Sequence, residues 1–248
     1  MPRRLGQHFL VRPSILERIA AVACSEDAGT IVEIGPGKGA LTAHLIERAP
    51  RVVAIEVDQV LVQYLRARFR EEPKLAIVEG DVLKVDLTQW GPVSVAGNLP
   101  YYITSPIVEK VLGIGTSLRS AVFLVQKEVA ERLTAAPGVR DYGFLTVATQ
   151  FFAEVELLFD VPPSAFRPPP KVDSAVVRLK PRKQLPAPDA KEFLRFASLC
   201  FHQKRKTLRN NLLGVYDKAR LDAIPETAQR AEQMPIAALI ELQRKLAG

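Results

Sequence analysis

Cysteine is scarce in this sequence, with only Cys24 and Cys200 among 248 residues. The two lie far apart, each in an apolar run, so a disulfide framework is excluded and no zinc-binding spacing exists. We interpret both as buried thiols of a protein that works in a reducing compartment. We expect no metal site.

Long hydrophobic runs are also missing. No stretch approaches the ~20 apolar residues that a membrane helix needs. Residues 1–8 contain no apolar segment of the kind that forms a signal peptide, and the chain has no internal repeats. The sequence therefore predicts a soluble, cytoplasmic protein without a membrane partner.

The chain does contain enough apolar material for a large core, and an excess of positive charge. Hydrophobic residues make up 48% of it and the formal net charge is +7, which favours an anionic partner. A Pro- and Lys-rich stretch at residues 180–188 marks a change in composition. We expect one domain at residues 1–180 and a helical domain at residues 181–248.

The first strong pattern is a β-branched run at residues 30–34 that meets a glycine-rich turn at residues 35–39 and continues as a helix. This is the strand–loop–helix opening of a nucleotide-binding α/β unit. The spacing fits a dinucleotide fingerprint loosely, and it also fits an S-adenosylmethionine loop. Glu33, within the strand, favours S-adenosylmethionine because a carboxylate suits a cationic, amine-bearing ligand better than a pyrophosphate.

Two further acids follow the next two predicted strands. Glu56 ends the strand at residues 52–55, where an acid accepts hydrogen bonds from ribose hydroxyls. Asp81 follows the strand at residues 75–78 and could hold an adenine amine. The alternatives are a helix N-terminal acid for Glu56 and a turn residue for Asp81.

The stretch at residues 96–102 ends a fourth predicted strand and has two interpretations. Asn98, Pro100 and Tyr101 could clamp a planar, amine-bearing molecule such as a nucleobase. Alternatively, Asn98 caps the next helix and the tyrosines pack in the core. Phe166, in a proline-rich loop, could form the second face of a base slot, or could simply be packed.

A basic cluster lies in the C-terminal part of the chain. Between residues 178 and 220 basic side chains far outnumber acidic ones, and Lys204, Arg205, Lys206 and Arg209 are its centre. Such a cluster is a candidate surface for nucleic-acid phosphates. The alternative is a merely solvated face.

Several of these stretches together resemble the family of ribosomal RNA adenine N6-dimethyltransferases, and within it the bacterial branch that acts on small-subunit (16S) RNA. The matching motifs are GQHFL at residues 6–10, EIGPGKGALT at 33–42, AIEVD at 54–58, GDVL at 80–83, GNLPY at 97–101, QKEVAERL at 126–133 and FRPPPKVDS at 166–174. The resemblance implies a class I S-adenosylmethionine-dependent methyltransferase fold: a seven-stranded, mostly parallel sheet with a small helical C-terminal domain that contacts RNA.

The same resemblance implies cofactor contacts from residues in the matching motifs, namely His8, Leu10, Gly35, Glu56, Asp81 and Asn98. The chain departs from the family at two positions. Many relatives have Asn where this chain has His8, and a small polar residue or Asn where it has Tyr102.

The activity that the resemblance implies is dimethylation of two adjacent adenines in a hairpin near the 3′ end of small-subunit RNA, by a monomer acting on an immature small subunit. We hypothesise that the Asn98 side-chain oxygen and the Pro100 carbonyl accept hydrogen bonds from N6, and that Tyr101 and Phe166 hold the ring.

Four rival functions remain: a resistance-type methyltransferase of the large subunit, a non-catalytic assembly factor, a DNA adenine methyltransferase and an NAD dehydrogenase. The 126–133 motif and the basic C-terminal segment disfavour the first. The retained glycine-rich loop and Asn98 disfavour a purely non-catalytic role. A DNA enzyme usually carries Asp in place of Asn98, and nothing in the chain resembles a hydride-transfer acid/base pair.

Overall fold

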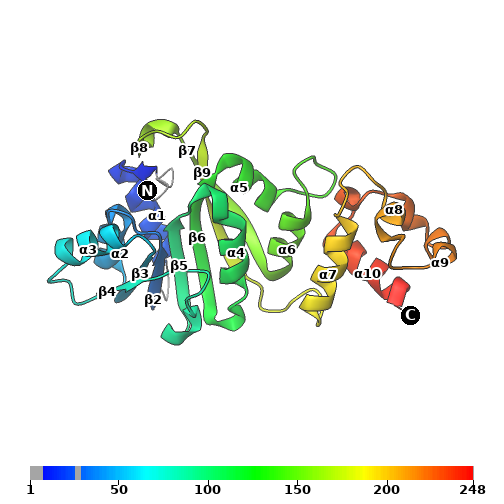
Figure 1. Ribbon diagram of the computed structural model, residues 1–248, viewed down its shortest axis with the longest axis horizontal. Coiled ribbons are helices and arrows are strands. Elements are labelled where there is room, and N and C mark those ends of the chain that lie inside the picture. The colour runs from blue at the N-terminus through cyan, green and yellow to red at the C-terminus, as the bar shows by residue number, and fades with distance from the viewer. Residues whose placement is uncertain (1–7, 26–28, 248) are drawn as a thin grey trace. The chain divides into compact units, whose positions relative to one another are not determined.

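The computed structural model describes residues 8–25 and 29–247. The chain divides into two compact units (Figure 1). Unit 1 comprises the described residues up to Ala130 together with Glu154–Pro181, and unit 2 comprises Glu131–Ala153 and the described residues from Arg182 onward. The second division falls between Pro181 and Arg182, whereas the sequence predicts a boundary after residue 180. The segment Glu131–Ala153, however, groups with the C-terminal helices, which differs from the expected continuous domain at residues 1–180.

A seven-stranded sheet organises unit 1. Its order is β4-β3-β2-β5-β6-β9-β7, with β2 at Thr30–Ile34, β3 at Arg51–Glu56, β4 at Leu75–Glu79, β5 at Val93–Asn98, β6 at Leu118–Gln126, β7 at Ala153–Val161 and β9 at Ser174–Pro181. The strands β4, β3, β2, β5 and β6 are parallel to their neighbours, whereas β9 is antiparallel to β6. This is the α/β architecture of class I S-adenosylmethionine-dependent methyltransferases, as the sequence predicts.

The order of the strands creates a crevice at the carboxyl ends of β2 and β5. The chain builds β3 and β4 on one side of β2 and then returns to place β5 on the other side. Connections from these two neighbouring strands therefore leave in opposite directions, which opens a ligand site at such a switch point.

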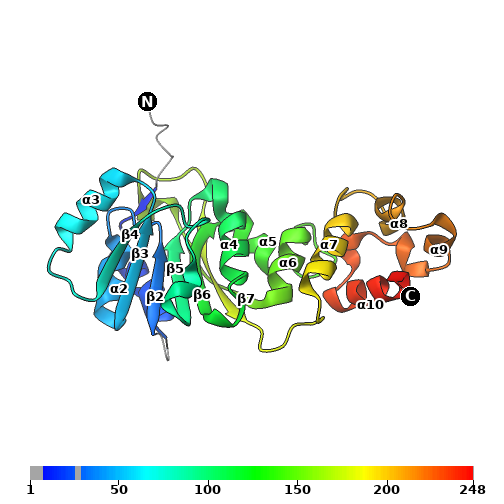
Figure 2. The ribbon, with the colours of Figure 1, turned by 60° about the horizontal axis from the view of Figure 1, so that its bottom comes forward.

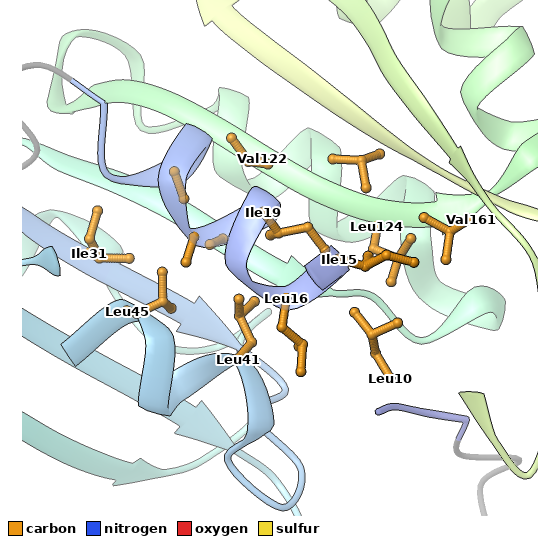
Figure 3. Close-up of a cluster of buried hydrophobic side chains, with 14 of the residues drawn as sticks. Leu10, Ile15, Leu16, Ile19, Ile31, Leu41, Leu45, Val122, Leu124 and Val161 are labelled. Carbon is orange, nitrogen blue, oxygen red and sulfur yellow. The ribbon is translucent and has the colours of Figure 1, made fainter. Parts of the chain in front are cut away.

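Helices cover the sheet because its strands carry apolar side chains on both faces. The helices of this part are α1 at Pro13–Ala23, α2 at Ala40–Arg48, α3 at Gln59–Arg68, α4 at Thr104–Leu112 and the first four residues of α5, which spans Lys127–Thr134 and passes into unit 2 after Ala130. Helix α4 packs on β6 (Figure 2). Helices α1 and α2 pack together, and the buried side chains of α1 meet Val122 and Leu124 of β6 (Figure 3).

A two-stranded sheet ties the N-terminal segment to a distant loop. Strand β1 (Phe9–Leu10) pairs antiparallel with β8 (Phe166–Arg167), which places Leu10 opposite Phe166. The Val11 amide also donates a hydrogen bond to the carbonyl oxygen of Ala165 at 2.8 Å. The first two residues of the GQHFL motif, at positions 6 and 7, lie outside the described residues.

Unit 2 has its own core, which explains why residues 131–153 belong to it. Its helices are α6 at Phe144–Phe152, α7 at Ala190–Cys200, α8 at Leu208–Leu212, α9 at Lys218–Asp222 and α10 at Ile236–Ala247. The rings of Phe151 and Phe193 stack with centroids 4.8 Å apart. The buried Tyr142 hydroxyl donates to the Met234 carbonyl at 3.0 Å. Aromatic burial therefore joins α6 to the C-terminal helices.

Short 3₁₀ helices complete the fold, at Leu87–Trp90 (η1), Tyr101–Ile103 (η2), Gly115–Ser117 (η3), Pro163–Ala165 (η4), Pro225–Ala228 (η5) and Ala231–Gln233 (η6).

Cys200 is buried as expected, whereas Cys24 is only partly buried, because the chain leaves α1 at that residue. Among the described residues, no helix is long and apolar enough to cross a membrane. The same residues contain no cluster of three metal-ligating side chains.

Candidate active site

A cavity of about 650 Å³ lies at the carboxyl ends of the parallel strands of unit 1. Its volume falls in the range of sites for small molecules and cofactors. Each residue that the sequence predicts as a cofactor contact lines it, namely His8, Leu10, Gly35, Glu56, Asp81 and Asn98. Pro100, Tyr101 and Tyr102 line it as well. The structure thus gathers residues from five separate motifs around one cavity.

The loop after β2 forms the floor of the cavity through its backbone. Gly35 has a φ of +66°, a conformation that is strained for any residue with a Cβ. Its amide donates to the Ile55 carbonyl at 3.0 Å. The backbone of β2 therefore turns sharply at the strand end and leaves the cavity free of side chains at this point.

Glu56 is held rigidly at the end of β3. Its side chain is almost fully buried and accepts three backbone hydrogen bonds, from Val57 and Asp58 to Oε1 at 2.9 and 3.0 Å and from Gly37 to Oε2 at 3.1 Å. Asp58, and not Glu56, caps helix α3. The alternative of a helix N-terminal acid for Glu56 is therefore wrong.

Asp81 is a turn residue and a cavity residue at once. Its Oδ1 accepts a hydrogen bond from the Leu83 amide at 3.0 Å, as an aspartate does in a tight turn. The side chain still lines the cavity. Both interpretations of this residue therefore hold together.

Glu33 is a buried acid in the wall of the cavity that the predicted contact residues do not include. Its side chain accepts a hydrogen bond from the Thr42 hydroxyl at 2.6 Å. Burial raises the pKa of the Glu33 carboxyl to about 8, and the nearby Glu56 carboxylate adds to that rise, while the Thr42 hydrogen bond opposes it. Glu33 is therefore largely protonated at neutral pH.

Asn98 is oriented by the N-terminal segment. Its Nδ2 donates to the His8 carbonyl oxygen at 3.0 Å, and no described residue donates to its Oδ1. Helix α4 begins after Ile103 without a side-chain cap, so the alternative in which Asn98 caps this helix is wrong. Close packing fixes the backbone just before Asn98, because a Cβ on Gly97 would lie 2.6 Å from the Ile34 carbonyl oxygen.

The carbonyl oxygen of Pro100 already accepts two hydrogen bonds. It accepts hydrogen bonds from the Ile103 amide at 3.1 Å and from the Thr104 hydroxyl at 3.2 Å. A carbonyl oxygen has two lone pairs, so a third donor must compete for this oxygen. Asn98 Oδ1 is the less occupied acceptor of the two.

The Tyr101 side chain is held by a contact to its hydroxyl and by a contact to its ring. Its hydroxyl shares a hydrogen bond with the Ser174 hydroxyl at 2.8 Å, and its ring stacks with the His8 imidazole at 5.9 Å between centroids and 26° between planes. Burial raises the pKa of the Tyr101 hydroxyl, against the effect of Ser174. The His8 Nδ1 in turn lies 2.9 Å from the Pro168 carbonyl oxygen. The ring is thereby fixed relative to Asn98.

Comparison with known proteins identifies the family behind this arrangement. The family described as "Ribosomal RNA adenine dimethylase" matches residues 2–245. The chain belongs to this family. Two relatives named "Ribosomal RNA small subunit methyltransferase A" agree with that assignment. The protein of Leptothrix cholodnii is 42% identical over 97% of this chain and 90% of its own length. That of Pseudomonas putida is 40% identical over 99% and 94%.

Two solved structures share the dimethylase fold over nearly the whole chain. A dimethyladenosine transferase from Plasmodium falciparum superposes with a TM-score of 0.83 at 27% identity, over 96% of this chain and 98% of that one. The 23S rRNA methyltransferase ErmE superposes with a TM-score of 0.77 at 29% identity, over 97% and 100%. The enzyme class that the sequence resemblance implies is thereby confirmed.

Phe166 does not line the cavity of this family member. Its side chain is fully buried in the core cluster that contains Leu10 and Ile15. The pairing of β1 with β8 draws Phe166 inward, opposite Leu10. In this structure it is a packed core residue and presents no face to the cavity, so the expected second wall of a base slot is not formed by it.

The four basic residues predicted to contact RNA differ in their surroundings within unit 2. Arg209 forms an ion pair with Asp222, and the Lys204 ammonium donates to the Arg140 carbonyl oxygen. Arg205 and Lys206 are exposed. Because Asp222 already compensates Arg209, the exposed pair Arg205 and Lys206 is better placed to meet phosphates.

The predicted contact residues omit three polar residues that hold the site together: Thr42, Thr104 and Ser174. Each is fully buried or nearly so and supports a neighbouring group through a hydroxyl. Thr42 and Ser174 lie in the matching motifs, so the sequence resemblance could have indicated these two residues. Nothing in the sequence indicates which acceptor each hydroxyl reaches.

Proposed function

We propose that the protein transfers methyl groups from S-adenosylmethionine to N6 of two adjacent adenines in the 3′-terminal hairpin of small-subunit ribosomal RNA. It acts as a monomer in the cytoplasm, on an immature small subunit. Support comes from membership of the rRNA adenine dimethylase family, from relatives named as small-subunit methyltransferases and from the cavity described above.

The chemistry of the cavity fits S-adenosylmethionine. Glu56 and Asp81 provide carboxylate acceptors at two strand ends, suited to the hydroxyl and amine groups of an adenosine. Gly35 leaves room for close approach by a ligand. Contacts to the cofactor would come from these residues and from His8, Leu10 and Asn98. The bound cofactor supplies an electrophilic methyl group on a sulfonium.

The proposal rests on the hydrogen bonding of the Asn98 side-chain amide. Its Nδ2 donates to the His8 carbonyl oxygen, which orients the amide. Its Oδ1 is the only side-chain atom that can accept a hydrogen bond, and no described residue donates to it. An adenine N6 is a poor nucleophile because its lone pair is delocalised into the ring. A hydrogen bond from N6 to Asn98 Oδ1 favours a tetrahedral nitrogen whose lone pair can attack the methyl group.

The proton balance requires no strong base. Transfer of the cofactor's methyl group to N6 would leave N6 positively charged and acidic, so that its proton would pass to solvent water. The monomethylated amine retains one N–H for the second transfer. One free acceptor, Asn98 Oδ1, is enough for that N–H, whereas the Pro100 carbonyl must first be released from Thr104 or Ile103.

The target adenine must leave its stack to reach this site. Tyr101 offers a fixed ring on which the base can lie, and such a stack is worth about 1–3 kcal/mol. In unit 2, Arg205 and Lys206 provide exposed charges for the RNA phosphates. Tyr101 thus serves the extruded base within unit 1, and Arg205 and Lys206 serve RNA phosphates within unit 2.

The test is a methyl-transfer assay with labelled S-adenosylmethionine and unmethylated small subunits, followed by mapping of the labelled base. Label on two adjacent adenines of the 3′-terminal hairpin supports the proposal. Label on large-subunit RNA alone favours the rival resistance-type activity, since ErmE shares the fold. Binding to small subunits without any label favours a non-catalytic assembly factor.

Asn98→Ala tests the assigned role within the same assay. We expect methyl transfer to be abolished, while the affinity for cofactor, measured by calorimetry, falls only modestly. Gln63→Ala, at an exposed amide of α3, is the matched control and should keep wild-type turnover. Wild-type turnover in Asn98→Ala would remove the proposed role of this amide.

A further inference from the structure

Tyr102 is the one aromatic residue at the cavity that neither the proposed mechanism nor the packing of the described residues uses. It lines the cavity, yet 62% of its surface is exposed. No described residue stacks on its ring or bonds its hydroxyl. A large aromatic side chain held at the mouth of a polar site, with no partner of its own, is suited to stacking on a ligand.

The local backbone directs Tyr102 away from the slot that Tyr101 serves. Both residues lie in the 3₁₀ helix η2, in which three residues make one turn. Successive side chains therefore project about 120° apart. With the Tyr101 side chain held by Ser174 and His8, Tyr102 projects in a different direction from the Tyr101 ring.

The nucleotide next to the target is the group that such a ring can meet. Because the target base leaves its stack to enter the cavity, one face of the neighbouring base loses its stacking partner. An exposed ring at the same cavity can cover that face. The proposed substrate has adenines at both of the positions that are used in turn, and a purine offers a large face for stacking.

We infer that Tyr102 is a second base-stacking site, which holds the adenine adjacent to the one in the catalytic slot. This inference rests on the proposed function, because it requires a substrate with neighbouring adenines. Tyr102 touches the neighbour rather than the reacting atoms, so it acts as a positioning and specificity residue. It favours target adenines that have a purine beside them.

The experiment measures kcat/KM for methylation of unmethylated small subunits by the wild type, Tyr102→Ala and Tyr102→Phe. Tyr102→Ala should lose about 5- to 160-fold, as expected for one lost base–aromatic stack of about 1–3 kcal/mol, whereas Tyr102→Phe should keep the wild-type rate because the ring remains. Tyr64→Ala is the matched control: Tyr64 is also an exposed tyrosine, on α3, and its replacement should have no effect.

Subunits whose RNA carries uridine in place of one of the two adenines complete a double-mutant cycle. On these subunits the wild type should lose rate at the remaining adenine, and Tyr102→Ala should lose little more. An equal loss for Tyr102→Ala on both RNAs would overturn the inference, since Tyr102 would then act on the target base or on the fold. So would Tyr102→Ala behaving like Tyr64→Ala. Failure of the wild type to methylate small subunits would instead refute the proposed function itself.

Discussion

The buried carboxyl of Glu33 makes the stability of the ligand-free protein depend on pH in a direction that can be calculated. Burial raises its pKa from an ordinary 4.5 to about 8. Between these values the unfolded chain has released the proton while the folded chain retains it. The folded state therefore loses stability as the pH rises, by about 1.4 kcal/mol per pH unit and at most about 5 kcal/mol in total.

Glu33→Gln removes this titration with little change in shape, because the amide oxygen of glutamine can still accept the hydrogen bond from Thr42. We expect the free energy of unfolding of the wild type to fall relative to that of Glu33→Gln as the pH rises from 5 to 8. Urea denaturation at four pH values measures it. Contributions from the histidines are common to both proteins and cancel in the difference.

Glu71→Gln is the control for this experiment, since Glu71 is exposed and its removal should leave the pH profile of the wild type unchanged. Parallel stability curves for the wild type and Glu33→Gln would refute the reasoning. They would mean that Glu33 is ionised in the folded protein, and that its burial is compensated by more than the hydroxyl of Thr42.

Three further predictions concern the positions around the site. Gly97→Ala should destabilise the protein by about 1–3 kcal/mol and lower turnover, because the new methyl group would displace β5 from the Ile34 carbonyl; urea denaturation and the transfer assay measure both. Tyr101→Phe should keep turnover within a few-fold whereas Tyr101→Ala should lose most of it, and equal losses would show that the hydroxyl, not the ring, matters. Arg205→Ala should reduce the salt dependence of RNA binding by about one phosphate contact, while Arg209→Ala, which removes an ion-paired cation, should leave it nearly unchanged.

The sequence predicts the cavity well because of a simple property of parallel sheets. Glu56, Asp81 and Asn98 each end or directly follow a strand whose β-branched, apolar character is visible locally. The carboxyl ends of parallel strands meet at one edge of the sheet. Local patterns plus this rule are therefore sufficient to bring the three side chains together.

Long-range pairing could not be predicted in the same way. The burial of Phe166 depends on its pairing with Leu10, which no local periodicity reports. The ion pair that engages Arg209 depends on Asp222 in a separate helix. The membership of residues 131–153 in unit 2 follows from packing between Phe151 and Phe193, whereas the composition changes only near residue 180.

The position of β9 in the sheet of unit 1 has a consequence for synthesis on the ribosome. Strand β9 lies between β6 and β7 in the sheet, although it is the last of the three in the chain. A nascent chain that ends before Ser174 therefore exposes one edge of β6, and lacks the Ser174 hydroxyl that meets Tyr101. Exposed strand edges favour aggregation. The residues that line the cavity are thus all made by Ile107, but Tyr101 gains its Ser174 partner only after about 70% of the polypeptide has been made.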